Sequence, residues 1–312
     1  MKPETRTFYE AAVHRAVERI ARSLDEALDL RALARGACLS TFHFHRLFRG
    51  IVGETPLELH RRLRLERAAE QLAIGGRPVT EIAFEAGYET HEAFTRAFRS
   101  HYDAAPSAFR ERATGAAVAC HGGPSIEIAT RSGLHFRSGR VDLGALVLTS
   151  GGAIMDVVFE TQPARRLATV RHIGPYPQIG EAFHRLGALA ASSGLHDHVD
   201  PQMLALYHDD PETTAAAELR SDAALVVRDD APLPAGLEET SLPAGRYARV
   251  THRGAYSGLG DAWARLMGEW LPGSGFRVGG GPSYEVYVTD PRTTATEDLR
   301  TDLYLPLADE VE

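Results

Sequence analysis

The first 112 residues of the chain repeat apolar side chains every three or four positions, which is the spacing of one face of an amphipathic helix. Glycine, proline and aspartate interrupt this pattern every few turns and so limit the length of each helix. Short helices are predicted near residues 8–22, 29–36, 40–49, 56–74, 79–86, 90–101 and 106–112. The alternation typical of strands is not a feature of this part, so it is predicted to be all-α.

A six-residue run is repeated within this helical part. Phe44-His45-Arg46-Leu47-Phe48-Arg49 returns fifty residues later as Phe94-Thr95-Arg96-Ala97-Phe98-Arg99, and a short predicted helix precedes each run. The first, fourth and fifth residues of each run share one helix face, which we expect to point inward. The order of short helix, turn and second helix predicts two helix-turn-helix units.

The opposite face of each second helix carries the candidate DNA-reading side chains. Arginine and small hydrogen-bonding side chains can read base edges when a helix enters the major groove. The candidates are Phe42, His45, Arg46 and Arg49 in the first unit, and His91, Glu92, Thr95, Arg96 and Arg99 in the second. A plain helical bundle is the alternative, but a bundle has no reason to repeat arginine on an outward face.

The helix predicted over residues 56–74 joins the two units. Its length would be about 28 Å, close to the roughly 34 Å of one turn of B-DNA, so one chain could reach two successive major grooves. Arginines on this helix could contact phosphate or could pair with neighbouring glutamates. They are Arg61, Arg62, Arg64 and Arg67.

These motifs resemble the DNA-binding domain of the AraC/XylS family of transcription regulators over most of residues 1–112. The shared features also include Arg62–Ala68, Gly87-Tyr88 and the closing Pro106–Arg110. The resemblance implies that double-stranded DNA and RNA polymerase are partners. It places the base-reading positions on Phe42, His45, Arg46, His91, Glu92, Thr95 and Arg96. The first turn departs from the family, because Cys38 stands where glycine is usual, and we expect this turn to be tilted.

Residues 113–155 differ in composition from their surroundings. The stretch from Thr114 to Gly123 consists mostly of small residues and predicts a linker. The following short alternating runs, among glycine and serine, predict one or two hairpins. We attach no function to them.

A second internal repeat, at a constant offset of eighty, fills the last part of the chain. Pro163, His172, Gly174 and Tyr176 return as Pro243, His252, Gly254 and Tyr256, and the register holds through to Asp222 and Asp302. Each copy is predicted as strand, helix, strand and strand. The whole chain is therefore predicted to be multidomain, with an all-α double helix-turn-helix domain over 1–112 and an α+β domain of two duplicated repeats over 156–312.

Two repeats related by a pseudo-two-fold axis leave a cleft between them, which is a usual place for a small ligand. The candidate ligand-binding aromatic residues are Tyr176, Phe183, Tyr256, Trp263 and Trp270. Core packing is the plain alternative for each of them. Glu285 also stands out, because the first copy has Ala205 at the equivalent position. An inward Glu285 needs a partner or a role, whereas an outward one would simply be solvated.

This part resembles the GyrI-like effector-binding domain in its His-x-Gly-x-Tyr turns, its Tyr-Glu-x-Tyr strand and its closing segment Asp302–Leu307. The resemblance implies an aromatic-lined pocket for hydrophobic, often cationic, compounds and places the pocket glutamate on Glu285. The two resemblances together are typical of regulators of the right-origin-binding-protein type.

Composition and charge support this division. The chain has a net charge of −8. Residues 1–112 hold 18 basic and 16 acidic residues, giving +2, and residues 113–312 hold 16 and 26, giving −10. Arginine supplies nearly all of the basic residues in the first part, which suits phosphate and guanine, although genome composition could explain it equally well.

Other classes of protein are not favoured. The sequence contains no stretch apolar enough to span a membrane and no export signal, so a cytoplasmic location is expected. Two distant cysteines predict neither a disulfide framework nor a thiol metal site. His196, Asp197, His198 and His208 match no metal template, and no cofactor is expected.

A ligand-responsive transcription regulator is the leading hypothesis, and two alternatives remain. The C-terminal domain could be a small-molecule hydrolase in which Glu285 and Tyr256 act on a positioned water. It could also be a binding protein that only sequesters its ligand. The attached DNA-reading domain weighs against the enzyme.

Overall fold

A computed structural model describes residues 3–117, 130–147 and 155–308, except 194, 196–198, 210 and 212–213. The chain forms two compact units. The sheet unit comprises residues 1–9, 38–50 and 150–312, and the helical unit comprises residues 10–37 and 51–149. The candidate metal ligands His196, Asp197 and His198 lie outside the described residues.

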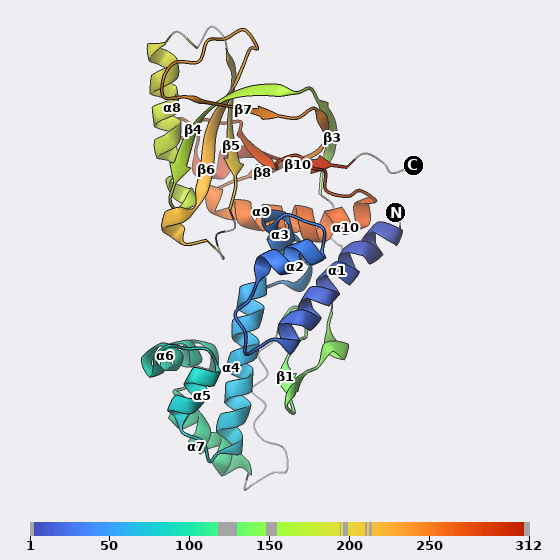
Figure 1. Ribbon diagram of the computed structural model, residues 1–312, viewed down its shortest axis with the longest axis vertical. Helices are drawn as coiled ribbons and strands as arrows, with labels where there is room; N and C mark the ends of the chain where they lie inside the picture. Colours follow the sequence, from blue (N-terminus) through green and yellow to red (C-terminus); the bar gives the residue numbers. More distant parts are fainter. Residues whose placement is uncertain are drawn as a thin grey trace. The chain divides into compact units, whose positions relative to one another are not determined.

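The predicted helices are all present (Figure 1). They are α1 Pro3–Arg22, α2 Leu30–Gly36, α3 Thr41–Val52, α4 Pro56–Ile74, α5 Val79–Glu85, α6 His91–Tyr102 and α7 Pro106–Ala117. Capping explains several of the boundaries. Thr55 and Glu58 form a capping box at the start of α4, with Pro56 in the first turn, and Thr90 caps α6. The all-α prediction for this part of the chain is confirmed.

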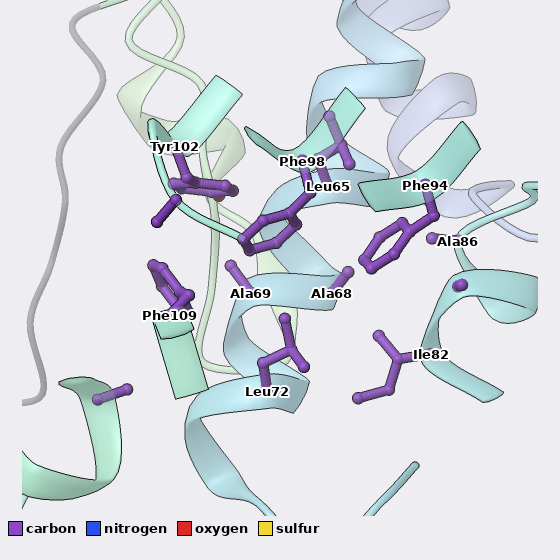
Figure 2. Close-up of a cluster of buried hydrophobic side chains, with 13 residues drawn as sticks. Leu65, Ala68, Ala69, Leu72, Ile82, Ala86, Phe94, Phe98, Tyr102 and Phe109 are labelled. Atoms are coloured by element: carbon purple, nitrogen blue, oxygen red, sulfur yellow. The ribbon is translucent and has the colours of Figure 1, made fainter. Parts of the chain in front are cut away.

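A cluster of apolar side chains from α4, α5, α6 and α7 forms a core of the helical unit (Figure 2). Phe94 and Phe98 on α6 are fully buried in it, and Leu72 and Ile82 approach from α4 and α5. The inward face predicted for the second recognition helix is therefore confirmed. Its burial leaves the opposite face of α6 directed away from the core.

Residues 130–147 form the predicted hairpin and pack along α4. Its strands are β1 Phe136–Arg137 and β2 Arg140–Val141. Arg62 donates to the carbonyl oxygen of Leu134 at 2.8 Å and to the carboxylates of Glu54 and Glu66. Glu66 also accepts from the backbone N–H of Phe136 at 2.7 Å. A buried ion network thus ties this hairpin to the joining helix.

The contacts of the α4 arginines decide between the two predicted roles, phosphate contact and pairing within the protein. Arg62 is buried, so the suggested phosphate contact is wrong for this residue. Arg64 donates to the carbonyl oxygens of Leu24 and Glu26, and Arg67 pairs with Asp25. Pairing inside the helical unit therefore accounts for these three, whereas the side chain of Arg61 is exposed.

The sheet unit contains an eight-stranded antiparallel sheet that curls, in the order β3-β8-β10-β9-β5-β6-β4-β7 (Figure 1). The strands are β3 Val158–Gln162, β4 Arg165–Ile173, β5 Val199–Tyr207, β6 Arg220–Val227, β7 Glu238–Leu242, β8 Gly245–Arg253, β9 Tyr284–Tyr287 and β10 Arg300–Leu307. The first copy supplies α8 Gly180–Ser192. The second supplies α9 Leu259–Arg265, which continues through a π-helical turn, Leu266–Trp270, into α10 Leu271–Ser274.

The duplication is confirmed, with one strand more per copy than predicted. Each copy begins with a short strand, β3 or β7, eighty residues apart, and this strand pairs with the other copy, β3 with β8 and β7 with β4. Both short strands lie at edges of the sheet and are largely exposed. Neither short strand alternates apolar and polar residues, which explains why the alternating pattern missed them.

The repeated His-x-Gly turns have a structural explanation. Gly174 and Gly254 have φ angles of 140° and 111°, which favour glycine. The ring nitrogen Nε2 of His172 lies 3.2 Å from the carbonyl oxygen of Pro175, and that of His252 lies 3.0 Å from the carbonyl oxygen of Ala255. The histidines therefore stabilise the turns that lead into α8 and α9.

The two copies meet where β5 pairs with β9. Ala205 lies opposite Glu285 in this antiparallel pair. Because these two residues are also equivalent in the repeat, they mark the pseudo-two-fold axis of the sheet unit. The position at which Ala205 of the first copy is replaced by Glu285 in the second therefore lies on this axis.

Candidate functional site

Glu285 is buried, with 2% of its surface exposed, and its carboxylate is surrounded by donors. The indole N–H of Trp263 donates to Oε1 at 2.8 Å. The hydroxyls of Tyr207 and Tyr287 donate to Oε2 at 3.0 and 3.1 Å. The two hydroxyls also lie 3.0 Å apart. The outward, solvated alternative for Glu285 is therefore wrong.

The symmetry of the repeat explains how these groups converge. Tyr207 and Tyr287 are equivalent residues, each two positions beyond the axis pair, so both point to the same face of the sheet as Glu285. Trp263 corresponds to Phe183 in the first copy. The second copy therefore has an acid together with an indole donor, where the first has alanine and phenylalanine.

Burial sets the electrostatics of this cluster. It raises the pKa of Glu285, and this effect is opposed by the Trp263 N–H, by the positive charge of Arg46 and by the tyrosine hydroxyls. Burial also raises the pKa values of Tyr207 and Tyr287 well above the usual value of 10.0, so both remain hydroxyl donors at neutral pH. The site is a buried carboxyl group whose charged form is stabilised by three hydrogen-bond donors and by the positive charge of Arg46.

Four of the five predicted aromatic residues gather around this carboxyl group. The rings of Tyr256 and Phe183 pack edge-on against Tyr287, at centroid distances of 5.3 and 5.4 Å, and Tyr176 packs against Tyr207 at 4.8 Å. Trp263 contacts Glu285 directly. Trp270 is placed elsewhere, because its described ring contact is with Phe159 at 6.1 Å.

Sequence reasoning missed the two tyrosines that contact Glu285. A signal was present, since both copies have tyrosine two positions after the axis residue, on the same face of the strand. The hydrolase alternative had assigned Tyr256 as the partner of Glu285. The structure instead brings the hydroxyls of Tyr207 and Tyr287 to the carboxylate, and Tyr256 contributes its ring.

A surface groove of about 480 Å³ lies beside this site within the sheet unit. Its walls are residues 38–43, the pair Tyr207 and His208, and the loop 278–283. Tyr207 thus faces both the groove and Glu285. The groove has the size of a small-molecule site.

The candidate DNA-reading residues of α6 lie on the exposed side of the helix. His91, Glu92, Arg96 and Arg99 are exposed, and Thr95 is half-buried. The N-cap hydrogen bond of Thr90 to the backbone N–H of Ala93 fixes the start of the helix just before them. This face can therefore meet a partner without any change in the core of the helical unit.

The equivalent face of α3 differs. Phe44, Leu47 and Phe48 are fully buried, as predicted for the inward face. Phe42 and His45 on the opposite face are buried as well, and Arg46 and Arg49 are partly buried. Cys38, in the turn before α3, has a φ angle of 56°, the left-handed conformation in which glycine is usual.

The raised pKa of Glu285 has a consequence for stability. An acid whose pKa is raised by folding makes folding less favourable as the pH rises above 4.5, its ordinary value, because the unfolded chain loses the proton first. We expect the melting temperature of Glu285→Gln, relative to that of wild type, to be higher at about pH 8 than at about pH 5. Calorimetry at both values measures this, and a variant destabilised equally at both would contradict it.

Known proteins match both parts of the chain. Residues 33–112 match the helix-turn-helix domain family, and residues 155–308 match the GyrI-like small-molecule-binding domain family. No helix in the described residues is long and apolar enough to cross a membrane. A DNA gyrase inhibitor from Yersinia enterocolitica is 36% identical over 152 residues, which are 47% of this chain and 93% of that protein.

The regulatory protein SoxS from Salmonella typhimurium is 31% identical over 104 residues, which are 33% of this chain and 97% of that protein. Among solved structures, the C-terminal domain of EcmrR aligns with 50% of this chain and 99% of its own length, at 16% identity and a TM-score of 0.41. The chain belongs to the AraC-type helix-turn-helix regulators with a C-terminal GyrI-like small-molecule-binding domain.

Proposed function

We propose that this regulator binds a specific DNA site through residues 1–112 and responds to a small hydrophobic cation bound by residues 156–312, with 113–155 joining the two. The observation that carries the proposal is the buried carboxyl group of Glu285, held by two tyrosines and a tryptophan among further aromatic rings. DNA as partner implies action in the compartment that holds the chromosome. RNA polymerase is the second proposed partner.

The chemistry of the site selects for a cation. Aromatic faces attract a cation by about 0.5–2 kcal/mol each, and the carboxylate supplies the opposite charge. A lipophilic cation can bury its apolar groups against Tyr176, Phe183 and Tyr256 while its charge ionises Glu285. A neutral molecule of the same shape would leave the carboxyl group without that compensation.

Hydrolysis is less well supported by the geometry. Both oxygens of Glu285 already accept hydrogen bonds from Trp263, Tyr207 and Tyr287. A water molecule activated by Glu285 would have to replace one of these donors. Sequestration of a ligand without regulation needs the same site but no DNA binding, so the DNA experiment below separates it from the proposal.

The role of Glu285 in ligand recognition can be tested with Glu285→Gln, which keeps the shape of the side chain and removes its charge. We expect the affinity for tetraphenylphosphonium to fall by at least about tenfold, which is about 1.4 kcal/mol, and the affinity for a neutral hydrophobic compound to change little. Calorimetry measures both. Glu239→Gln, which removes an exposed acid at an edge strand, is the control.

Two results would contradict this assignment. Equal losses for the cation and the neutral compound would give Glu285 a structural role only. Absence of binding by a broad panel of cations to the wild-type protein would favour an uncharged effector or the hydrolase.

The second recognition helix offers the clearest test of DNA reading. We expect Arg96→Ala to weaken binding to the specific site by about 1–3 kcal/mol and to relax the preference at one base pair, because an exposed arginine on this helix reads a base edge. Arg140→Ala, which removes an exposed arginine from the β1–β2 hairpin, should leave the preference unchanged. Selection from a random DNA pool followed by gel shifts measures affinity and preference.

Unaltered affinity and unaltered base preference in Arg96→Ala would show that this face of α6 does not read DNA. A uniform loss over all sequences would instead assign Arg96 to phosphate contact.

A further inference from the structure

The N-terminal part of α3 packs against the GyrI-like domain inside the sheet unit, and Arg46 is central to this contact. Its guanidinium lies 3.5 Å from the ring centroid of Phe42 and 5.5 Å from that of Trp263. Phe42 and Trp263 pack edge-on, with centroids 6.1 Å apart. Trp263 is the same indole that donates to Glu285, so one ring joins a DNA-reading candidate to the buried acid.

Polar contacts flank this aromatic stack. His43 Nε2 lies 2.7 Å from Ser283 Oγ, and both residues are buried. Burial, with a smaller effect from Arg46, lowers the pKa of His43 to about 4, so the ring is neutral at physiological pH. Arg49 pairs with Asp261 at 2.6 Å, although Asp261 is exposed and this pair contributes little energy.

The closest approach is between backbones. A Cβ atom at Gly50 would lie 2.1 Å from the carbonyl oxygen of Ala264 and 2.6 Å from Cα of Gly268. Neither backbone atom can move aside as a flexible side chain would. Glycine is therefore required at position 50 for the contact between α3 and the helix that begins with α9.

The two recognition helices differ at three of the residues on the side of α3 that packs against the GyrI-like domain. At an offset of fifty, Phe42 corresponds to Glu92, His43 to Ala93 and Gly50 to Ser100. Glu92 and Ser100 are exposed on α6. Arg46 and Arg49, in contrast, have equivalents in the second helix, Arg96 and Arg99. The first helix therefore has the shared arginines together with residues that fit the GyrI-like domain.

We infer that the face of the GyrI-like domain formed by Asp261, Trp263, Ser283 and Glu285 is a binding surface for the first recognition helix, and that it competes with DNA for Phe42, Arg46 and Arg49. These side chains cannot contact base edges while they pack on this face. Arg46 then serves as an internal cation beside Glu285. A cationic effector that takes over this position releases the helix for DNA, a step that rests on the proposed function.

The glycine at position 50 gives the sharpest test. Gly50→Ala should prevent docking sterically without disfavouring α3 itself, because alanine is a better helix former than glycine. We expect the full-length variant to bind the specific DNA site about fivefold or more tightly than wild type without any effector. Tetraphenylphosphonium should raise DNA affinity in wild type and have little further effect in the variant.

The control is Gly187→Ala in α8, where an added Cβ meets no atom within 4 Å. It should behave as wild type. Ser283→Ala provides a second, milder change. It removes the hydroxyl group that lies within hydrogen-bond distance of His43, and Ser283 itself lies outside the DNA-binding domain. It should shift DNA affinity in the same direction as Gly50→Ala by a smaller factor.

A structural measurement keeps the docking separate from the ligand. In a Trp270→Phe background Trp263 is the sole tryptophan, since the chain has two. Its fluorescence should shift to longer wavelength in Gly50→Ala, because Trp263 is fully buried when α3 is docked. The shift should be absent in Gly187→Ala.

The outcomes distinguish docking from ligand recognition. In one outcome, Gly50→Ala shows higher DNA affinity and shifted fluorescence while wild type does not respond to the cation. This result would support the docking surface and contradict the proposed effector. If folded Gly50→Ala retains wild-type DNA affinity and wild-type fluorescence, the docking surface is wrong, whatever the cation does.

Discussion

The sheet unit is organised around one buried carboxyl group on its pseudo-two-fold axis. A buried acid must be neutral or surrounded by donors, and the second repeat supplies an indole N–H while both repeats supply a tyrosine hydroxyl. The first repeat has alanine and phenylalanine at the corresponding positions and needs no such arrangement. The duplication therefore provides a symmetric frame. The residues that differ in the second copy, Trp263 and Glu285, create a polar site within it.

Under the proposed function, the same carboxyl group connects ligand binding with DNA reading. Trp263 contacts Glu285 through its N–H and lies beneath Arg46 through its ring. Within the sheet unit, the arginine of the first recognition helix thus has the kind of surroundings that we propose for a cationic effector. Competition between two cations for one acid offers a simple physical link between ligand binding and the release of a recognition helix.

Local patterns predicted the helices well, because capping residues and a spacing of three or four residues act within a single helix. The sequence does not decide whether Glu285 faces inward, since alternation along β9 shows that neighbouring residues face opposite sides but not which side is buried. Tyr207 and Tyr287 become partners only through the axis between the copies. The edge strands β3 and β7 do not alternate apolar and polar residues and so give no strand signal. The burial of Phe42 depends on residues more than two hundred positions away.

The protonation state of Glu285 tests the central claim most directly. Infrared difference spectroscopy, with the double variant that adds Glu285→Gln as reference, can follow this carboxyl group in Gly50→Ala, in which Arg46 is no longer docked beside it, as tetraphenylphosphonium is added at the pH where ligand-free Glu285 is half protonated. The account predicts that the band of the protonated acid is replaced by that of the carboxylate and that protons are released to the buffer. A bound cation that leaves the protonation of Glu285 unchanged would contradict it.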